Sequence, residues 1–142
     1  MTAWRGCEIP GRLWYDVSHD VWLDPLPDGS VRLGLTDVAQ TRAGKLLAIL
    51  FKKPGRHVEA GQSAATIGSA KWVGPFPVPV GGTIVEANEP AFAADILIAN
   101  RDPYGAGWLI VVAISDPKEL EQLLSAADYE KFLETAGGST GD

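Results

Sequence analysis

A lysine at a tight turn between two apolar segments is the most distinctive chemical group in this sequence. Lys71 lies in the segment IGSAKWVGP, residues 67–75, with glycine and proline close on both sides. An amine at the tip of a hairpin is accessible to an enzyme that joins it to a carboxylic acid, which would remove its charge and add a new side group. The same pattern also fits an ordinary solvated turn lysine. Taken by itself, the pattern favours that ordinary interpretation.

The other chemistry-bearing residues do not form a recognisable set. His19 and His57 are isolated, and neither a paired-histidine spacing nor a cysteine pair is present, so no metal site is expected. No Ser-His-Asp set, phosphate-binding glycine loop or pair of catalytic carboxylates can be assembled. Cys7, the single cysteine, is expected to be a small, partly buried thiol. The protein is therefore not expected to be an enzyme.

Short apolar runs separated by glycine and proline indicate a fold built mostly of β-strands. The 16 Gly and 10 Pro interrupt runs that are rich in Val, Ile and Leu. A turn at Asp28 and Gly29 joins one predicted hairpin, and the Lys71 turn joins another. The almost wholly apolar run at 108–114 predicts a central strand. The expected strands are 21–24, 31–35, 45–51, 57–59, 63–70, 76–80, 83–88 and 108–114.

Short helices are expected on either side of the strands. Thr36 suits the N-cap of a helix that ends at Gly44, and residues 90–100 are expected to be irregular or briefly helical. Two similar hairpins that face each other would form a small sandwich, with the Lys71 turn at one end.

The C-terminal part is expected to be helical. Ser115 is predicted to cap a helix that starts at Asp116. A further helix over 126–135 has an apolar stripe formed by Tyr129, Phe132 and Leu133. Residues 1–136 are thus expected to form one domain with C-terminal helices, and residues 137–142 a flexible tail.

Composition limits the partners and the compartment. The 142 residues have a formal net charge of -6, which argues against nucleic acid and anionic membranes as partners. No segment approaches the roughly 20 apolar residues of a membrane-spanning helix. One cysteine allows no internal disulfide, and residues 1–11 lack the apolar run of a signal peptide. We expect a cytoplasmic protein.

Four stretches of the sequence resemble the H protein of the glycine cleavage system, a family of lipoyl carriers. Residues 28–40, DGSVRLGLTDVAQ, look like the family's DG-x-V-x-VGIT-x-AQ segment. Residues 55–61 resemble its V-G-x-x-V-x-x-G turn, and residues 79–89 resemble PVSGEVVEVNE. Residues 100–109, NRDPYGAGWL, resemble the specific string N-x-DPYG-x-GWL. These stretches follow the family's order and cover nearly the whole chain.

The resemblance implies both a fold and a covalent cofactor. The fold would be a lipoyl/biotinyl-type antiparallel β sandwich (barrel-sandwich hybrid) with short flanking helices. The family's acceptor lysine lies in an E-S-V-K-A motif, and Lys71 occupies that position. Lys71 would carry lipoate, attached by a lipoate ligase or other lipoyl-attachment enzymes. The lipoyl arm would swing between partner enzymes, which raises the effective concentration of its reactive end at each of them.

Two departures from the family motif bear on the pathway. Gly68 replaces an acidic residue, and Trp72 replaces a small one. The string KWVGP, residues 71–75, looks more like the H-protein-like lipoate-binding proteins of sulfur-oxidising prokaryotes. Those proteins work with a heterodisulfide-reductase-like complex, and the arm would carry sulfur-bearing intermediates or electrons. The alternative is a glycine cleavage H protein that carries an aminomethyl group between decarboxylase, aminomethyltransferase and dihydrolipoyl dehydrogenase.

Two other classes of function stay open. A biotin carrier usually has methionines around its lysine, whereas Ala70 and Trp72 flank Lys71 here. An unmodified interaction domain would keep the fold without the arm. Trp72 fits a partner-docking role about as well as a core role, because a tryptophan at a turn tip cannot easily enter a small sandwich. His19 loosely matches a family histidine, but the local spacing differs, and we assign it no role.

Overall fold

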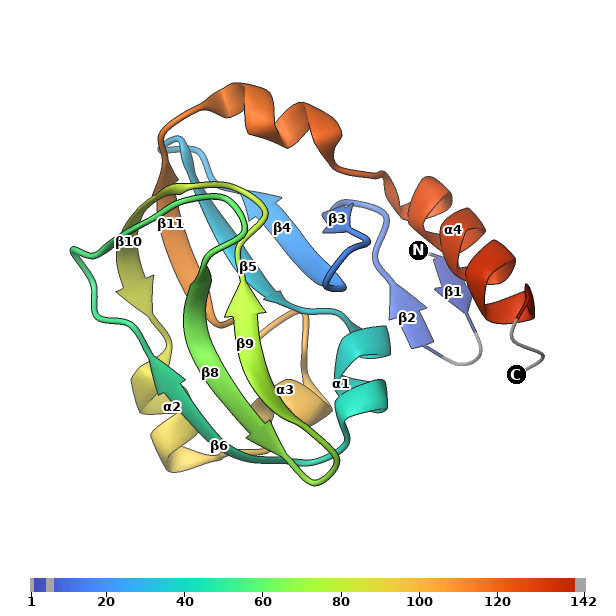
Figure 1. Cartoon of the computed structure of the whole chain (residues 1–142), viewed down its shortest axis with the longest axis horizontal. Coiled ribbons are helices and arrows are strands. Elements are labelled where there is room, and N and C mark those ends of the chain that lie inside the picture. The colour runs from blue at the N-terminus through green and yellow to red at the C-terminus, as the bar shows by residue number, and fades with distance from the viewer. Residues whose placement is uncertain (1, 5–6, 140–142) are drawn as a thin grey trace.

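Two antiparallel β-sheets face each other (Figure 1). They enclose most of the buried apolar side chains. The computed structural model describes residues 2–4 and 7–139. The larger sheet has six strands, in the order β3 (Trp14–Asp16), β4 (Val21–Pro25), β5 (Ser30–Leu35), β11 (Ile110–Ile114), β10 (Gly82–Ala87) and β7 (His57–Val58). The smaller sheet has three, in the order β6 (Leu46–Phe51), β8 (Ser63–Ser69) and β9 (Val73–Pro77). The expected mostly-β sandwich is confirmed.

The core between the sheets follows from the alternation of apolar side chains along the strands. Leu33 of β5 and Val112 of β11 are fully buried, as are Ile67 of β8 and Phe76 of β9 from the facing sheet. β11 lies between β5 and β10, so the prediction of a central strand is confirmed. Each side chain of this size contributes about 1.5–3 kcal/mol on burial. This core therefore fixes the position of the β8–β9 turn.

The helix α1 (Asp37–Ala43) begins and ends where its capping residues predict. The Thr36 hydroxyl accepts a hydrogen bond from Ala39 N at 3.1 Å. Gly44 ends the helix with a φ of 82°, in the left-handed region that glycine favours. The stretch predicted to be irregular or briefly helical contains two short helices, α2 (Glu89–Ala94) and α3 (Ile98–Arg101).

A second, smaller core joins the N-terminal strands to the C-terminal helix. The strands β1 (Thr2–Trp4) and β2 (Cys7–Ile9) pair as a ribbon, and Figure 1 shows the helix α4 (Ala126–Ser139) beside it. The ring of Tyr129 stacks on that of Tyr15, with 4.7 Å between ring centroids. The sequence pattern missed β1, β2 and β3. The buried members of this core are Cys7, Ile9, Leu13, Tyr15, Trp22, Val38, Ala126, Tyr129 and Leu133.

The strand after the Lys71 turn differs from its prediction over 76–80. β9 starts earlier, at Val73, and ends at Pro77. Pro75 and Pro77 made the start of this segment look like a turn, but a proline is tolerated in an edge strand because one side of that strand forms no ladder hydrogen bonds. β9 is such an edge strand of the smaller sheet. The turn that carries Lys71 is consequently tighter than predicted.

The helix predicted from Asp116, with Ser115 as its cap, is wrong. The segment is a 3-10 helix, η1 (Pro117–Gln122), and Asp116 is its cap. The Asp116 carboxylate accepts a hydrogen bond from Lys118 N at 3.0 Å. A residue before proline is held in an extended conformation, so Asp116 cannot be helical itself.

The C-terminal helix is longer than predicted. Of the predicted apolar stripe, Tyr129 and Leu133 are buried, whereas Phe132 is 45% exposed. The flexible tail predicted at 137–142 is wrong for 137–139, where α4 continues through Ser139. Extending a formed helix is much easier than nucleating one, which offsets the low helix propensity of glycine. Residues 140–142 lie outside the described residues. No helix among the described residues is long and apolar enough to cross a bilayer.

Candidate functional site

The turn between β8 and β9 carries Lys71 at its tip. Ser69 closes this turn: its backbone N–H donates to Trp72 O at 2.7 Å, and its hydroxyl oxygen lies 3.1 Å from Trp72 N. The same hydroxyl lies 2.7 Å from the carbonyl oxygen of Ala43, the last residue of α1. Ser69 is buried, so these contacts are shielded from water. The backbone beneath Lys71 is therefore fixed both by its own strands and by the helix.

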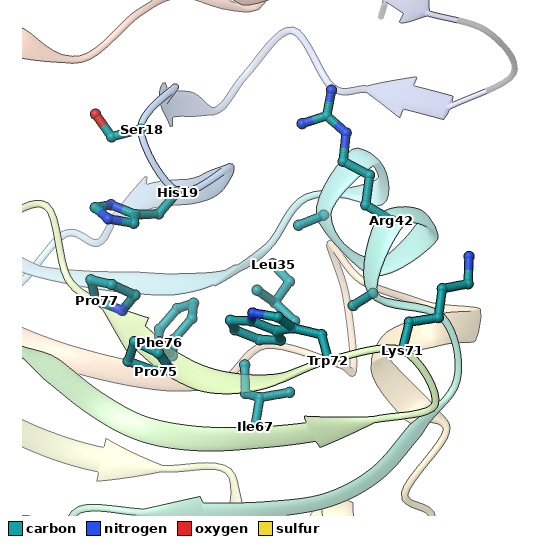
Figure 2. Close-up of a pocket in the computed structure, with 12 residues that line it drawn as sticks. Ser18, His19, Leu35, Arg42, Ile67, Lys71, Trp72, Pro75, Phe76 and Pro77 are labelled. Carbon is teal, nitrogen blue, oxygen red and sulfur yellow. The ribbon is translucent and has the colours of Figure 1, made fainter. Parts of the chain in front are cut away.

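The Lys71 side chain leaves the turn beside the end of α1, as Figure 2 shows. A Cβ atom added at Gly44 would lie 3.5 Å from Lys71 Cε, so the apolar stem passes close to the glycine that ends the helix. Lys71 is exposed, and among the described residues its ammonium has no ion-pair partner. The amine at this position is free for covalent attachment.

Trp72 neither enters the core nor projects freely into solvent. Its indole folds back over Gly74, where an added Cβ atom would overlap the ring. Figure 2 shows the indole lying between the Lys71 stem and the Phe76 ring. The side chain is 44% exposed, so one face packs while the other is open to a partner. The prediction that Trp72 docks onto a partner stays a prediction.

A groove runs from Lys71 across the gap between the two sheets. It has a volume of about 530 Å³, within the range of about 300–1,000 Å³ typical of ligand sites. Leu35, Ile67 and Phe76 make its lining largely apolar, and His19 and Arg42 supply polar groups at its margin. We call this the Lys71 groove. Its full lining is Ser18, His19, Leu35, Ala39, Arg42, Ala43, Ile67, Lys71, Trp72, Pro75, Phe76 and Pro77.

A histidine–carboxylate contact and an ion pair position the polar groups of the groove. His19 Nδ1 lies 3.3 Å from Asp16 Oδ2, and Arg42 donates to Asp20 Oδ2 at 3.0 Å. Asp20 also accepts a hydrogen bond from Tyr129 Oη at 2.8 Å. Burial raises the pKa of Asp20 above its ordinary value, and the hydrogen bond from Tyr129 works in the opposite direction. Asp20 thus links the C-terminal helix to the margin of the groove.

The structure separates the remaining candidates from this site. Cys7 is buried 3.8 Å from the Thr41 hydroxyl, and burial raises the pKa of its thiol, so the expectation of a buried thiol is confirmed. His57 is exposed and pairs with Glu59 at 3.2 Å. Among residues 2–4 and 7–139, no group of three or more His, Cys, Asp or Glu side chains is placed to hold a metal ion.

The groove residues outside the Lys71 turn were missed by sequence reasoning. Ser18, His19 and Arg42 come from the β3–β4 connection and from α1, far from Lys71 in the sequence. His19 was set aside, yet it lines the same groove as Lys71 (Figure 2). The local sequence contains no pattern that pairs these segments, because the pairing depends on how the two sheets face each other.

The chain is similar to the members of one known protein family. It matches the family described as glycine cleavage H-protein over residues 13–136. It is 44% identical to the probable glycine cleavage system H protein 2 of Saccharolobus solfataricus over 137 residues, which cover 94% of this chain and 92% of that protein. It is 46% identical to glycine cleavage system H protein 3 of Aquifex aeolicus over 126 residues, covering 87% and 78% of the two chains.

A solved structure agrees with the sequence comparison. The crystal structure of a glycine cleavage system H protein from Mycobacterium marinum superposes with a TM-score of 0.74 at 36% sequence identity. The match covers 87% of this chain and 98% of that one. The two folds therefore agree over most of both chains.

Proposed function

The chain belongs to the glycine cleavage H-protein family, and from that premise we propose that Lys71 carries its lipoyl group. Members of this family are carriers with a lipoate covalently attached to a lysine, and they are not enzymes. The observation that carries the assignment is the exposed amine of Lys71 at the tip of the β8–β9 turn.

The residues around Lys71 fit such a group. Attachment forms an amide bond between the Lys71 amine and the carbonyl of an activated lipoyl donor, whose adenylate or thiol leaves. The product is uncharged, and the apolar Lys71 groove beside it offers a place where an apolar chain is shielded from water. The fixed backbone under Lys71 keeps the attachment point in one place while the arm moves.

The attached group supplies thiol–disulfide and group-carrying chemistry when it is bound. This chain's own residues position it. Trp72 and Phe76 provide apolar contacts along the groove, while His19 and Arg42 provide polar contacts at its margin. The protein therefore presents and shelters a reactive group that other enzymes use.

The glycine cleavage enzymes are the first candidates for the partners. The relatives from Saccharolobus solfataricus, Aquifex aeolicus and Mycobacterium marinum are all named as glycine cleavage system H proteins. These names favour what the sequence offered as the alternative, an arm that carries an aminomethyl group between decarboxylase and aminomethyltransferase. Dihydrolipoyl dehydrogenase would then reoxidise the arm in the cytoplasm.

A heterodisulfide-reductase-like sulfur-oxidising complex is the second candidate, and the surface at the turn favours it. Gly68 leaves no carboxylate beside Lys71, and Trp72 adds a half-exposed aromatic ring. Relatives numbered 2, 3, 4 and 5 come from the single organism Aquifex aeolicus. An organism with several family members can use some of them with client enzymes other than the glycine cleavage enzymes.

One experiment tests the function and separates the two candidates. The lipoylated chain is mixed with glycine decarboxylase and aminomethyltransferase, and glycine-dependent bicarbonate exchange is followed. Rates close to those of an authentic glycine cleavage H protein support the first candidate. Rates lower by about tenfold or more point to the second, because a lost charge-assisted hydrogen bond costs about 1.5–3 kcal/mol.

A double variant controls for the cause of any loss. Gly68→Glu with Trp72→Ala restores the acidic and small residues of the family motif. A Cβ atom at Gly68 would meet only ordinary contacts, the nearest at 3.9 Å, so the strand tolerates the change. If the turn surface decides the client, this variant gains exchange activity. An unchanged rate would show that the turn surface does not decide it.

A further inference from the structure

The outer face of the smaller sheet lacks charge and adjoins Lys71. The strand register places Ala48, Gly68 and Val73 in one row across the sheet, and Leu50 and Thr66 in the next. All five are exposed or partly exposed. We call these residues the uncharged face.

Several large apolar side chains on or beside this face are mostly exposed to solvent. Leu50 is 73% exposed and Val73 is 74% exposed, and Leu47 at the adjoining bulge is 67% exposed. Val73 is the first residue of β9 after the Lys71 turn, so the apolar surface begins beside that turn. Contiguous exposed apolar surface of this kind indicates a contact with another molecule.

Positive charge borders the uncharged face in a protein that is acidic as a whole. From Val38 to Val85 the only acidic residue is Glu59, whereas the basic residues are Arg42, Lys45, Lys52, Lys53, Arg56 and Lys71. Lys45 accepts a backbone hydrogen bond from Ala70 beside the turn, and Lys52 and Lys53 follow the other end of β6. Among the described residues Lys45, Lys52 and Lys53 have no ion-pair partner.

We propose that the uncharged face is the docking surface for the enzyme that attaches the lipoyl group, through an apolar patch bordered by carboxylates on that enzyme. The inference rests on the proposed function of Lys71. An attachment enzyme acts on the bare lysine, whose side chain is short, so its surface must contact the turn and whatever adjoins it. Client enzymes react at the end of the modified arm, which is longer by the whole lipoyl chain, so they can contact the Lys71 turn without covering Leu50 and Val73. Basic groups at the border complement acidic groups on the enzyme and orient it.

The test measures attachment on the full chain in its unmodified form. Purified chain is incubated with lipoate, ATP and the lipoate–protein ligase of the same host, and intact mass gives the initial rate. Leu50→Glu and Val73→Glu each place a carboxylate on the face, one on β6 and one on β9. We expect kcat/KM for attachment to fall at least about tenfold, as for an interface residue that dominates binding, and further at low salt.

Val85→Glu is the matched control. Val85 is 53% exposed on β10 in the other sheet, outside the uncharged face. Attachment to this variant should stay within about twofold of the wild type, since isolated surface changes are nearly neutral. Circular dichroism and thermal unfolding check that all three variants fold.

A second measurement separates attachment from client use. The Leu50→Glu and Val73→Glu chains are lipoylated to completion with excess ligase, and the reduction of their lipoyl group by NADH, catalysed by dihydrolipoyl dehydrogenase, is followed. Rates equal to wild type support the proposal. The proposal would be overturned by an equal loss in both reactions, by no loss in attachment, or by an equal loss with Val85→Glu. It would also be overturned by a wild-type dimer that Leu50→Glu dissociates. Failure of the wild-type chain to accept lipoate at Lys71 would instead refute the proposed function.

Discussion

Removing one hydroxyl from the C-terminal helix should destabilise the protein in a pH-dependent way. Tyr129→Phe deletes the donor to Asp20 Oδ1 at 2.8 Å and the contact with Thr36 Oγ1 at 3.1 Å. The ring stacking on Tyr15 needs no hydroxyl and should persist. A hydrogen bond to a charged group is worth about 1.5–3 kcal/mol, so we expect a loss of about 2 kcal/mol at pH 7. That corresponds to a fall in Tm of about 4–8 °C for a chain of this size.

The dependence on pH identifies the mechanism. The Tyr129 hydroxyl favours the ionised form of Asp20, whose pKa is raised by burial, so the bond is strongest at pH values where Asp20 is ionised. The loss should shrink to about 1 kcal/mol at pH 3, where the carboxyl is protonated and the bond is a neutral one. Urea unfolding at both pH values measures it.

A residue on the same helix supplies the control. Phe132→Leu alters an exposed ring and should change the free energy of unfolding by less than about 0.5 kcal/mol. A Tyr129→Phe loss of equal size at pH 3 and pH 7, or one no larger than the control, would refute the role assigned to Asp20.

Three further substitutions probe the groove and its supports. Because folding raises the pKa of Asp20, this residue stabilises the folded protein at pH values below its ordinary pKa of 3.8. That stabilisation is lost as the pH rises through the pKa of Asp20 in the folded protein. Asp20→Asn, which tolerates the φ of 54°, should therefore gain stability relative to wild type between about pH 3 and pH 7 in urea unfolding, and a flat difference would contradict this. Gly74→Ala should displace the Trp72 indole without unfolding the sheet, visible as a shift of its indole N–H resonance; an unmoved resonance would count against the packing described. Asn100→Ala removes the amide that donates to Gly44 O at 3.0 Å and accepts from Leu46 N at 3.0 Å. We expect the free energy of unfolding, measured by thermal unfolding, to fall by about 2 kcal/mol, and a loss under about 0.5 kcal/mol would contradict this.

Elements with local turn and cap chemistry could be predicted from the sequence. The Asp28-Gly29 turn forms as expected, with Gly29 at a φ of 88° and Asp28 accepting from Ser30 N at 3.0 Å. Thr36 and Gly44 fix both ends of α1 for the same reason, since each supplies its own backbone partner or conformation. The position of Lys71 at a hairpin tip also follows from residues close to it in the sequence.

Features that depend on distant segments could not be predicted. The ribbon of β1 and β2 exists because α4 and α1 complete its core, and three-residue strands carry almost no period of their own. His19 joins the Lys71 groove only because the β3–β4 connection reaches the smaller sheet. The edge position of β9, which permits Pro75 and Pro77, is likewise set by the sheet order.

The site of attachment is the central claim, and peptide mapping tests it most directly. Protein purified from its native host is digested, and the added mass of a lipoyl group is located by fragmentation. The prediction is modification at Lys71 alone, and none on a Lys71→Arg variant that keeps the wild-type fold by circular dichroism. Lipoyl mass on the Lys71→Arg chain, or a wild-type chain that stays unmodified beside a second, lipoylated carrier in the same cells, would contradict it.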